Sequence, residues 1–400
     1  MSEQKYWLWL VNLPNIHSAK ISVLLEKFKT PLDIYNANES DFDGLDKIGK
    51  REISALCNKD LTKANEIIKK LDELGAYALC FDDKFYPSAL KSCYEPPYVL
   101  YVLGEKINWD EMLCISVVGS RECTDYGINA TSEICADLAD SGVVIVSGMA
   151  RGIDSAAHRS ALAAGAKTVA FLGCGLDIIY PPENEALMQA IAKNGAVMTE
   201  FAPGTPPYGK NFPIRNRLIA AFSRGVLIAE AKRKSGTLIT ADWAIENGKD
   251  VFALPGDYNR DSSSGCNFLI KNGGAKLVEC AEDILNEYVY ELENIDMGRF
   301  GKSEPVYVEE TIRTTKARTH NEEKKTNNDK KNVDINSPRY DTLDEKQKSI
   351  IMLLADGDKH IDEICRSVDM SVSEVGAALT IMELLGFVVA LSGKMFTLNI

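Results

Sequence analysis

The chain has 400 residues, of which 45% are hydrophobic and 26% charged, and its formal net charge is −13 at pH 7. This size predicts two or three domains, and the sequence has no run of about 18 apolar residues that would predict a membrane span. The acidic balance argues against a chain that coats nucleic acid over its whole surface, although it allows a local basic groove.

The N-terminus and the cysteines indicate a reducing compartment. Residues 1–5 lack the charged-then-apolar pattern of a secretion signal. The ten cysteines are scattered without a Cys-x-x-Cys pair, and several lie in apolar surroundings, as is typical of small core residues. We therefore expect a cytoplasmic protein.

Residues 1–70 are predicted to form a helical module, with helices at 6–10 and 16–28 and shorter ones near 34 and 53–56. Two stretches in it, 13–16 and 45–50, resemble the hairpins of helix-hairpin-helix modules, whose backbone N–H groups contact DNA phosphates. Only the second stretch contains a glycine. A plain helical packing module is therefore the stronger interpretation, and DNA contact is the alternative.

Residues 71–290 are predicted to form one domain around a parallel sheet. Residues 71–113 carry short apolar pieces and prolines, which predict strands added at the sheet edge. Apolar strands then alternate with helices, which is typical of a doubly wound, Rossmann-like sheet. The predicted strands are 115–118, 143–146, 168–172, 196–199, 226–228 and 251–254, and the predicted helices are 126–139, 155–164, 184–193, 215–222 and 238–246.

The C-terminal part of the chain changes character. Residues 296–340 are polar and highly charged, which predicts a flexible linker. Residues 342–400 show three helices followed by a hairpin, the order of a winged helix. Its third helix contains Glu374 and Glu383 but no Lys or Arg. Repulsion from phosphates argues against direct DNA reading, so we expect a protein contact there.

Small-residue loops accompany several predicted strands, and in a parallel sheet such loops share the carboxyl edge, where ligands bind. Their unpaired backbone N–H groups and two arginines favour an anion. No Gly-x-Gly-x-x-Gly follows a strand, and Gly301-Lys302-Ser303 lacks the first glycine and the strand of a phosphate loop, so we expect no nucleotide cofactor. The loops are Gly119-Ser120-Arg121, Ser147-Gly148 with Arg151, Gly173-Cys174-Gly175, Ser235-Gly236-Thr237 and Pro255-Gly256.

A second informative stretch covers residues 208–217. It places Lys210, Arg215 and Arg217 around the aromatic Phe212. Cations track phosphates, an aromatic face can stack an unpaired base, and Asn216 can bond a base edge or the backbone. The pattern is equally compatible with a solvated helix start after a proline and with Phe212 in the core.

Candidate catalytic residues are few. Asp154 and His158 lie four residues apart on one predicted helix and could form a metal site or an acid–base pair. No second histidine or carboxylate cluster completes such a site, so we interpret them as a helix-start aspartate and a packed histidine. Ser147 lies outside any Gly-x-Ser-x-Gly elbow. The residues thus give no strong case for an enzyme.

Several ordered motifs together resemble the DNA-processing protein A family of bacteria (DprA, also called Smf). The resemblance covers about residues 80–285 and extends to the whole chain by domain order. It implies an extended Rossmann-like doubly wound α/β sheet, an all-α N-terminal module and a C-terminal winged helix. The motifs are Val117–Arg121, Ser147–Asp154 with His158, Tyr180-Pro181, Phe212–Arg217, Ser235–Thr240 and Pro255-Gly256.

The resemblance implies binding rather than catalysis. Members of the family bind single-stranded DNA that enters by natural transformation, protect it and help to load the RecA recombinase. The implied contact residues are Gly119, Ser120, Arg121, Ser147, Gly148, Phe212, Arg215 and Asn216, with Lys210 near a basic position that recurs in the family. We add Arg217, and also Arg151, which is left open between a phosphate contact and structural pairing. The implied homodimer forms through the region 266–277, which contains Cys266, Asn267, Phe268, Ile270 and Leu277.

Two alternatives of other classes stay open. Related Rossmann domains resemble nucleoside-monophosphate phosphoribohydrolases, which carry a Pro-Gly-Gly-x-Gly-Thr motif with a nearby Glu. The corresponding region here, Lys234 to Thr237, lacks that motif. The other alternative is a scaffold that contacts only proteins, with the glycine loops serving the fold.

Overall fold

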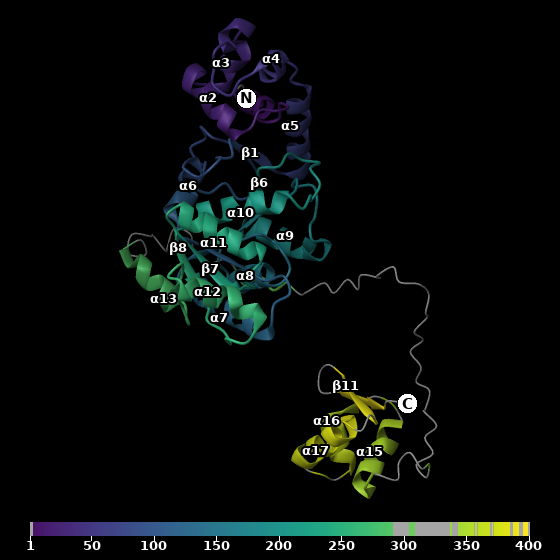
Figure 1. Ribbon diagram of the computed structural model, residues 1–400. Helices are drawn as coiled ribbons and strands as arrows, with labels where there is room; N and C mark the ends of the chain where they lie inside the picture. Colours follow the sequence, from purple (N-terminus) through teal and green to yellow (C-terminus); the bar gives the residue numbers. More distant parts are fainter. Residues whose placement is uncertain are drawn as a thin grey trace. The chain divides into compact units, whose positions relative to one another are not determined.

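The computed structural model of the chain describes residues 3–290, 304–308, 337, 343–355, 357, 359–368, 370, 372–384, 387–391 and 395–398. The chain divides into two compact units, Met1–Thr314 and Thr315–Ile400 (Figure 1). Most of the expected flexible linker at 296–340, including Gly301-Lys302-Ser303, lies outside the described residues. The prediction is wrong for 304–308, because the Val306 N–H donates to the Leu162 carbonyl at 3.0 Å and Val306 and Val308 pack on the buried cluster of the first unit. None of the helices in the described part is long and apolar enough to cross a membrane.

The first unit is built on a nine-stranded sheet in the order β1-β2-β6-β5-β4-β3-β7-β8-β9. From β6 to β9 all neighbours pair in parallel, whereas β1 and β2 are antiparallel additions at one edge. This confirms the predicted doubly wound sheet and its edge extension. The strands are β1 Tyr77–Cys80, β2 Val99–Gly104, β3 Cys114–Gly119, β4 Val144–Ser147, β5 Thr168–Phe171, β6 Gly195–Thr199, β7 Gly225–Glu230, β8 Asp250–Ala253 and β9 Lys276–Leu277.

Helices cover both faces of this sheet (Figure 1). Alternate strand residues enter opposite clusters: Val118 and Ile228 pack with the cluster of α10 and α11, whereas Val117 and Leu227 pack with that of α7 and α8. Burial on both faces explains why the strands read as continuous apolar runs. The helices are α7 Asp125–Asp140, α8 Ile153–Ala163, α9 Glu185–Lys193, α10 Asn211–Phe222, α11 Gly236–Glu246, α12 Ser264–Lys271 and α13 Glu282–Leu285.

Helix α10 begins four residues before its predicted start at Arg215, because the proline lies inside the helix. Pro213 occupies the first turn, where the backbone N–H has no partner within the helix, so its missing N–H costs nothing. The Asn211 side chain also donates a 2.9 Å hydrogen bond to the Gly173 carbonyl and anchors the helix start on the loop after β5. The earlier start brings Asn211 and Phe212 into the helix.

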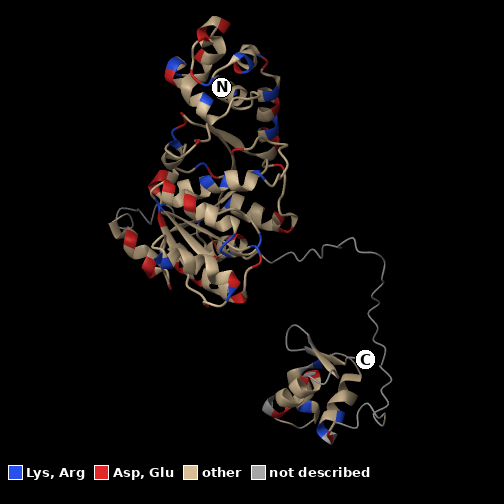
Figure 2. Ribbon diagram, in the orientation of Figure 1, with Lys and Arg blue, Asp and Glu red and all other residues tan. Residues whose placement is uncertain are grey.

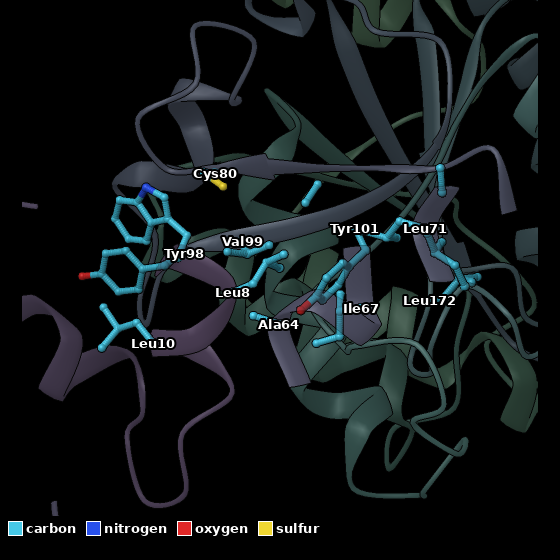
Figure 3. Close-up of a cluster of buried hydrophobic side chains, with 14 of the residues drawn as sticks. Leu8, Leu10, Ala64, Ile67, Leu71, Cys80, Tyr98, Val99, Tyr101 and Leu172 are labelled. Atoms are coloured by element: carbon cyan, nitrogen blue, oxygen red, sulfur yellow. The ribbon is translucent and has the colours of Figure 1, made fainter. Parts of the chain in front are cut away.

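The N-terminal helices share a buried cluster with the sheet rather than packing on their own (Figure 3). Leu8 and Leu10 lie in the same cluster as Val99, Tyr101 and Leu172. The expected domain boundary at residue 70 falls inside α5. These helices are α1 Gln4–Val11, α2 Ser18–Phe28, α3 Pro31–Asn36, α4 Lys50–Cys57 and α5 Thr62–Leu74.

The two hairpin-like stretches of this region form similar tight turns. The third residue of each turn has a positive φ, 64° at Asn15 and 60° at Lys47. In the second turn, however, the Gly49 N–H donates to Glu52 Oε2 at 3.0 Å, and Glu52 pairs with Lys20 at 2.8 Å. A carboxylate thus occupies the helix end that a phosphate would need, which favours the packing interpretation.

The second unit contains the elements expected of a winged helix around its own buried cluster, which includes Ile350, Leu354, Ile364 and Leu379. Its three strands pair in the order β10-β12-β11. The elements are α15 Glu345–Ala355, β10 Lys359–His360, α16 Ile361–Val368, α17 Val372–Leu384, β11 Val388–Leu391 and β12 Met395–Leu398.

Candidate functional site

A groove of 760 Å³ opens at the carboxyl edge of the sheet, where strand order reverses between β3 and β7. The chain runs from β3 towards β6 on one side and from β7 towards β9 on the other, so the loops after β3 and β7 diverge there. The Ser120 N–H donates a 2.8 Å hydrogen bond to the Glu230 carbonyl and joins the bases of these loops. The groove is lined by the loop after β3 and by the first turns of α10 and α11.

One wall of the groove brings together a cation and an aromatic ring that the sequence predicts as contacts. The Arg121 guanidinium lies 5.4 Å from the centre of the Phe212 ring, and Arg121 is exposed. A Cβ at Gly173 would lie 2.9 Å from Phe212 Cδ1, so this position has room only for glycine. Phe212 lines the groove and is half-buried, so the structure favours the ligand-facing interpretation of this ring over the core one.

Arg215 forms the floor of the groove rather than a free cation. It is 3% exposed, and its Nη1 donates to the carbonyls of Gly148 and Phe171. Burial lowers the pKa of Arg215 to about 10, and the nearby Asp154 carboxylate opposes that shift. Burial likewise raises the pKa of Asp154, against the effect of Arg215. The two hydrogen bonds of Arg215 join the loop after β4 to the end of β5 beneath the groove.

The Ser147-Gly148 loop supplies a backbone carbonyl that binds Arg215, and the absence of a side chain at Gly148 leaves room for the Arg215 guanidinium. The Ser147 hydroxyl is fully buried and donates to the Val117 carbonyl at 2.6 Å, so it points into the sheet and does not line the groove. A Cβ at Gly148 would lie 2.6 Å from the Arg215 guanidinium. Gly148 is therefore required for Arg215 to reach its carbonyl partners.

Two of the predicted cations are paired with acids. The exposed Arg151 donates from Nε to Glu183 Oε1, which is the structural pairing that the sequence left open. Arg217 is 5% exposed, pairs with Glu200 and does not line the groove. Because residues two apart on a helix point in nearly opposite directions, Arg215 and Arg217 cannot both face the groove. The structure therefore places Arg217 away from the predicted contact surface.

Two further predicted contacts, Lys210 and Asn216, lie near the start of α10. Lys210 precedes the helix as an exposed residue, with its Nζ 6.0 Å from the ring of Tyr208. Asn216 lines the groove, accepts from Arg215 Nε at 3.2 Å and reaches the Gly236 carbonyl at 3.5 Å. Asn216 thereby links the floor of the groove to α11.

The Asp154–His158 pair is not arranged as an acid–base or metal site. His158 is fully buried, and its Nδ1 lies 2.7 Å from the Thr168 hydroxyl, which itself donates to the Ile145 carbonyl. Burial lowers the pKa of His158 to about 3, so the ring is neutral. Over the described ranges, no cluster of three His, Cys, Asp or Glu side chains could hold a metal ion.

The sequence places the loop before α11 at the ligand edge but assigns none of its side chains as contacts. Lys232, Ser235, Thr237 and Thr240 line this side of the groove. The loop Ser235-Gly236-Thr237 is recognisable as a small-residue loop, but nothing local distinguishes its hydroxyls from solvated ones. The exposed acid Glu122 also lines the groove, and Figure 2 shows basic and acidic segments interspersed over the helices of this unit.

The residues expected at a dimer interface divide into buried and accessible ones. Cys266 is 1% exposed, and Asn267 is engaged by the backbone of Gly256, to which it donates at 2.9 Å. Phe268 lies under the Arg233 guanidinium at 4.2 Å, and Leu277 is 43% exposed on β9, the last strand of the sheet. Ile270 is half-buried.

Comparison with known proteins gives concordant matches over most of the chain. A family profile described as DNA recombination-mediator protein A matches residues 77–289, and a DprA winged helix domain matches residues 336–394. Protein Smf of Synechocystis is 32% identical over 399 residues, which cover 97% of this chain and 96% of that protein. The DNA processing protein DprA of Streptococcus pneumoniae is 43% identical over 208 residues, covering 52% of this chain and 73% of that protein. An X-ray structure of DprA from S. pneumoniae covers 72% of this chain and 99% of its own, with a TM-score of 0.58 and 34% identity.

Proposed function

The chain belongs to the DNA recombination-mediator protein A family (DprA, also called Smf), and from this membership we propose that it binds single-stranded DNA in the groove between the loops after β3 and β7. The observation that carries the proposal is the Arg121–Phe212 pair on the groove wall. A cation that follows the backbone beside a ring that can stack a base is the combination that unpaired nucleic acid requires.

We expect the groove to favour a single strand over a duplex. In a duplex the bases are stacked and paired, so a half-buried ring such as Phe212 finds no free base face. The Arg121 guanidinium and the backbone N–H groups of the surrounding loops supply contacts that depend on phosphate and not on base identity. We therefore expect weak sequence preference.

Further properties follow from family membership as parts of the same proposal. We propose that the protein acts in natural transformation or recombination, protects the bound strand and helps to load RecA, and that it does so by binding and without a catalytic step. RecA filament growth on an oligonucleotide already bound by this chain would test the loading. A homodimer would use the accessible Phe268, Ile270 and Leu277, and Leu277→Asp should then lower the mass measured by light scattering.

The decisive experiment is a fluorescence-anisotropy titration with single-stranded and duplex probes across salt concentrations. Arg121→Ala should weaken single-strand binding and lower the salt slope by about 0.7, the value for one lost contact to a single strand. Arg51→Ala, an exposed arginine on α4, is the matched control and should bind as the unmodified chain does. Equal affinity and slope for Arg121→Ala would contradict the assigned groove.

The same protein preparation separates the proposal from its two alternatives. Release of a nucleobase from common nucleoside monophosphates would favour the phosphoribohydrolase class and contradict a binding protein. Absence of any oligonucleotide binding at low salt would favour a scaffold that contacts only proteins.

A further inference from the structure

We propose that the N-terminal end of α11 is a second phosphate subsite of the groove, which binds a phosphodiester of the same strand through the hydroxyls of Ser235 before the helix and of Thr237 and Thr240 in its first two turns. The subsite rests on the proposed function, because it extends the groove that Arg121 and Phe212 line. It faces the loop after β3 across the point where the strand order reverses.

The hydroxyl groups at this end of α11 make no hydrogen bonds within the chain, unlike the hydroxyls of the other threonines in residues 77–290. Residues 77–290, all described by the structure, contain seven threonines. Thr237 and Thr240 are the two whose hydroxyls make no hydrogen bond, although Thr240 is only 1% exposed and both line the groove. In the same range the buried Ser235 Oγ also has no partner. The hydroxyls of Thr124, Thr131, Thr168, Thr199 and Thr205 all bond protein oxygens.

The missing bond of Thr240 is the one that a helical threonine ordinarily makes. Thr131 in α7 donates to the carbonyl of Gly127, four residues earlier, at 2.6 Å. Thr380 in α17 does the same to Gly376 at 2.8 Å. Thr240 also has a glycine four residues before it, Gly236, and yet makes no such bond. Buried polar groups are normally paired, yet Ser235 Oγ is buried without a partner, and Thr237 and Thr240 line the groove without a bond inside the chain. These hydroxyls are therefore available to a partner that is not part of the chain.

The N-terminus of α11 has no side-chain cap and no acidic residue in its first turn, which favours an anion there. The Ser235 side chain precedes α11 without accepting an N–H from it, and the first turn of α11 carries no acidic residue. In α7, by contrast, Thr124 caps the helix by accepting from Gly127 N, and Asp125 supplies an acid in the first turn. An uncapped N-terminus offers free N–H groups and a positive dipole end to a phosphate.

The charge around this turn has the sign that the ligand requires. Lys232 lines the groove just before α11, and its Nζ lies 3.5 Å from Asp261 in a pair in which both side chains are more than half exposed. Such a pair is weak and can rearrange when a phosphate arrives. Hydroxyls, N–H groups and a lysine together make a site for a phosphodiester that is independent of base identity.

The test uses the full-length double variant Thr237→Val/Thr240→Val, which removes two hydroxyls at nearly constant shape. With an oligothymidylate bearing a 5′-hydroxyl, we expect the affinity to fall about a hundredfold, because each of the two lost hydrogen bonds to a charged group is worth about tenfold. The salt slope should not change, because no charge is removed. The melting temperature should be equal or higher, because the hydroxyls have no partner in the free protein.

Two further variants complete the design. Thr380→Val removes a helical hydroxyl from the winged-helix unit and should leave the affinity unchanged. Lys232→Gln should lower the salt slope by about 0.7. If the double variant folds poorly, Thr237→Val alone provides the measurement, because Thr237 is only half-buried.

The outcomes separate the subsite from the function on which it rests. If Arg121→Ala weakens binding and the threonine variants bind as the unmodified chain does, the subsite is wrong and the groove stands. If the unmodified chain binds no single strand, the proposed function itself is wrong. If the threonine variants weaken only oligonucleotides that carry a 5′-phosphate, the site holds a terminal phosphate, and the assignment to an internal phosphodiester is overturned.

Discussion

Arg121 covers the ring of Phe212 in the free protein, with its guanidinium 5.4 Å from the ring centre. Because Arg121 is exposed and remains hydrated above the half-buried ring, this contact contributes only about 1 kcal/mol. An incoming base can therefore take the place of the guanidinium on the ring and leave the cation free to meet the adjacent phosphate. The two residues thus support each other before binding and can serve two different parts of a nucleotide afterwards.

Phe212→Leu should weaken single-strand binding by about 1–3 kcal/mol, the value of one lost base–aromatic stack. Leucine keeps an apolar side chain against Gly173, and no charge is lost. The salt slope should therefore match that of the unmodified chain, which distinguishes this variant from Arg121→Ala. Anisotropy at several salt concentrations measures both quantities, and an unchanged affinity would show that no base stacks there.

Gly148→Ala should destabilise the chain by about 1–3 kcal/mol and weaken DNA binding, because the new methyl group displaces the Arg215 guanidinium. Gly209→Ala is the matched control. Gly209 lines the same groove, and a Cβ there would meet nothing within 4 Å. Urea unfolding and anisotropy on both variants check the prediction, which is wrong if the two variants behave alike.

Arg217→Met should cost about 3 kcal/mol of unfolding free energy, because it leaves the Glu200 carboxylate, whose Oε1 is buried, without its cation. Adding Glu200→Gln removes that uncompensated charge and should recover part of the loss. The folded fraction of Arg217→Met should still bind single-stranded DNA, because Arg217 lies away from the groove. Loss of binding in fully folded protein would return Arg217 to the contact surface.

His158 should make the chain less stable as the pH falls. Its pKa is lowered to about 3 in the folded state, while the unfolded chain takes up a proton near pH 6.5. Between these values the unfolded state binds more protons, so His158 removes about 1.4 kcal/mol of stability for each pH unit below 6.5. Urea unfolding between pH 7 and 4.5 should show a steeper pH slope for the unmodified chain than for His158→Gln, and parallel slopes would contradict the assignment.

The strands and the ligand edge of the sheet are predictable from the sequence because their signals are local. A strand buried on both faces reads as a continuous apolar run, and a loop that receives a ligand or a helix start reads as small residues. Once the strands are known, parallel pairing brings loops such as Gly119–Arg121 and the start of α11 to one edge. Residues far apart in the chain could therefore be grouped correctly.

The directions in which individual side chains point could not be predicted from the sequence as well as the strands could. The predicted helix already contains Arg215 and Arg217 two residues apart, so the sequence shows that they point in different directions but not which of them faces the groove. Ser147 resembles a loop hydroxyl, but it ends a strand and turns into the sheet. Thr240 is one threonine among many, and only the missing bond to Gly236 distinguishes it. These distinctions depend on tertiary contacts that no short pattern encodes.

The groove lies where β3 pairs with β7, the seam between the two halves of the sheet, so a bound DNA strand affects the stability of that pairing. The residues on its walls come from parts of the chain that meet only when the two halves of the sheet join, with β3 and β7 as the central pair. A ligand that contacts both loops binds the joined sheet and not the separated halves, so binding stabilises the seam itself. Bound single-stranded DNA would then hold the two halves of the sheet together, so the DNA-bound protein would resist their separation more than the free protein does.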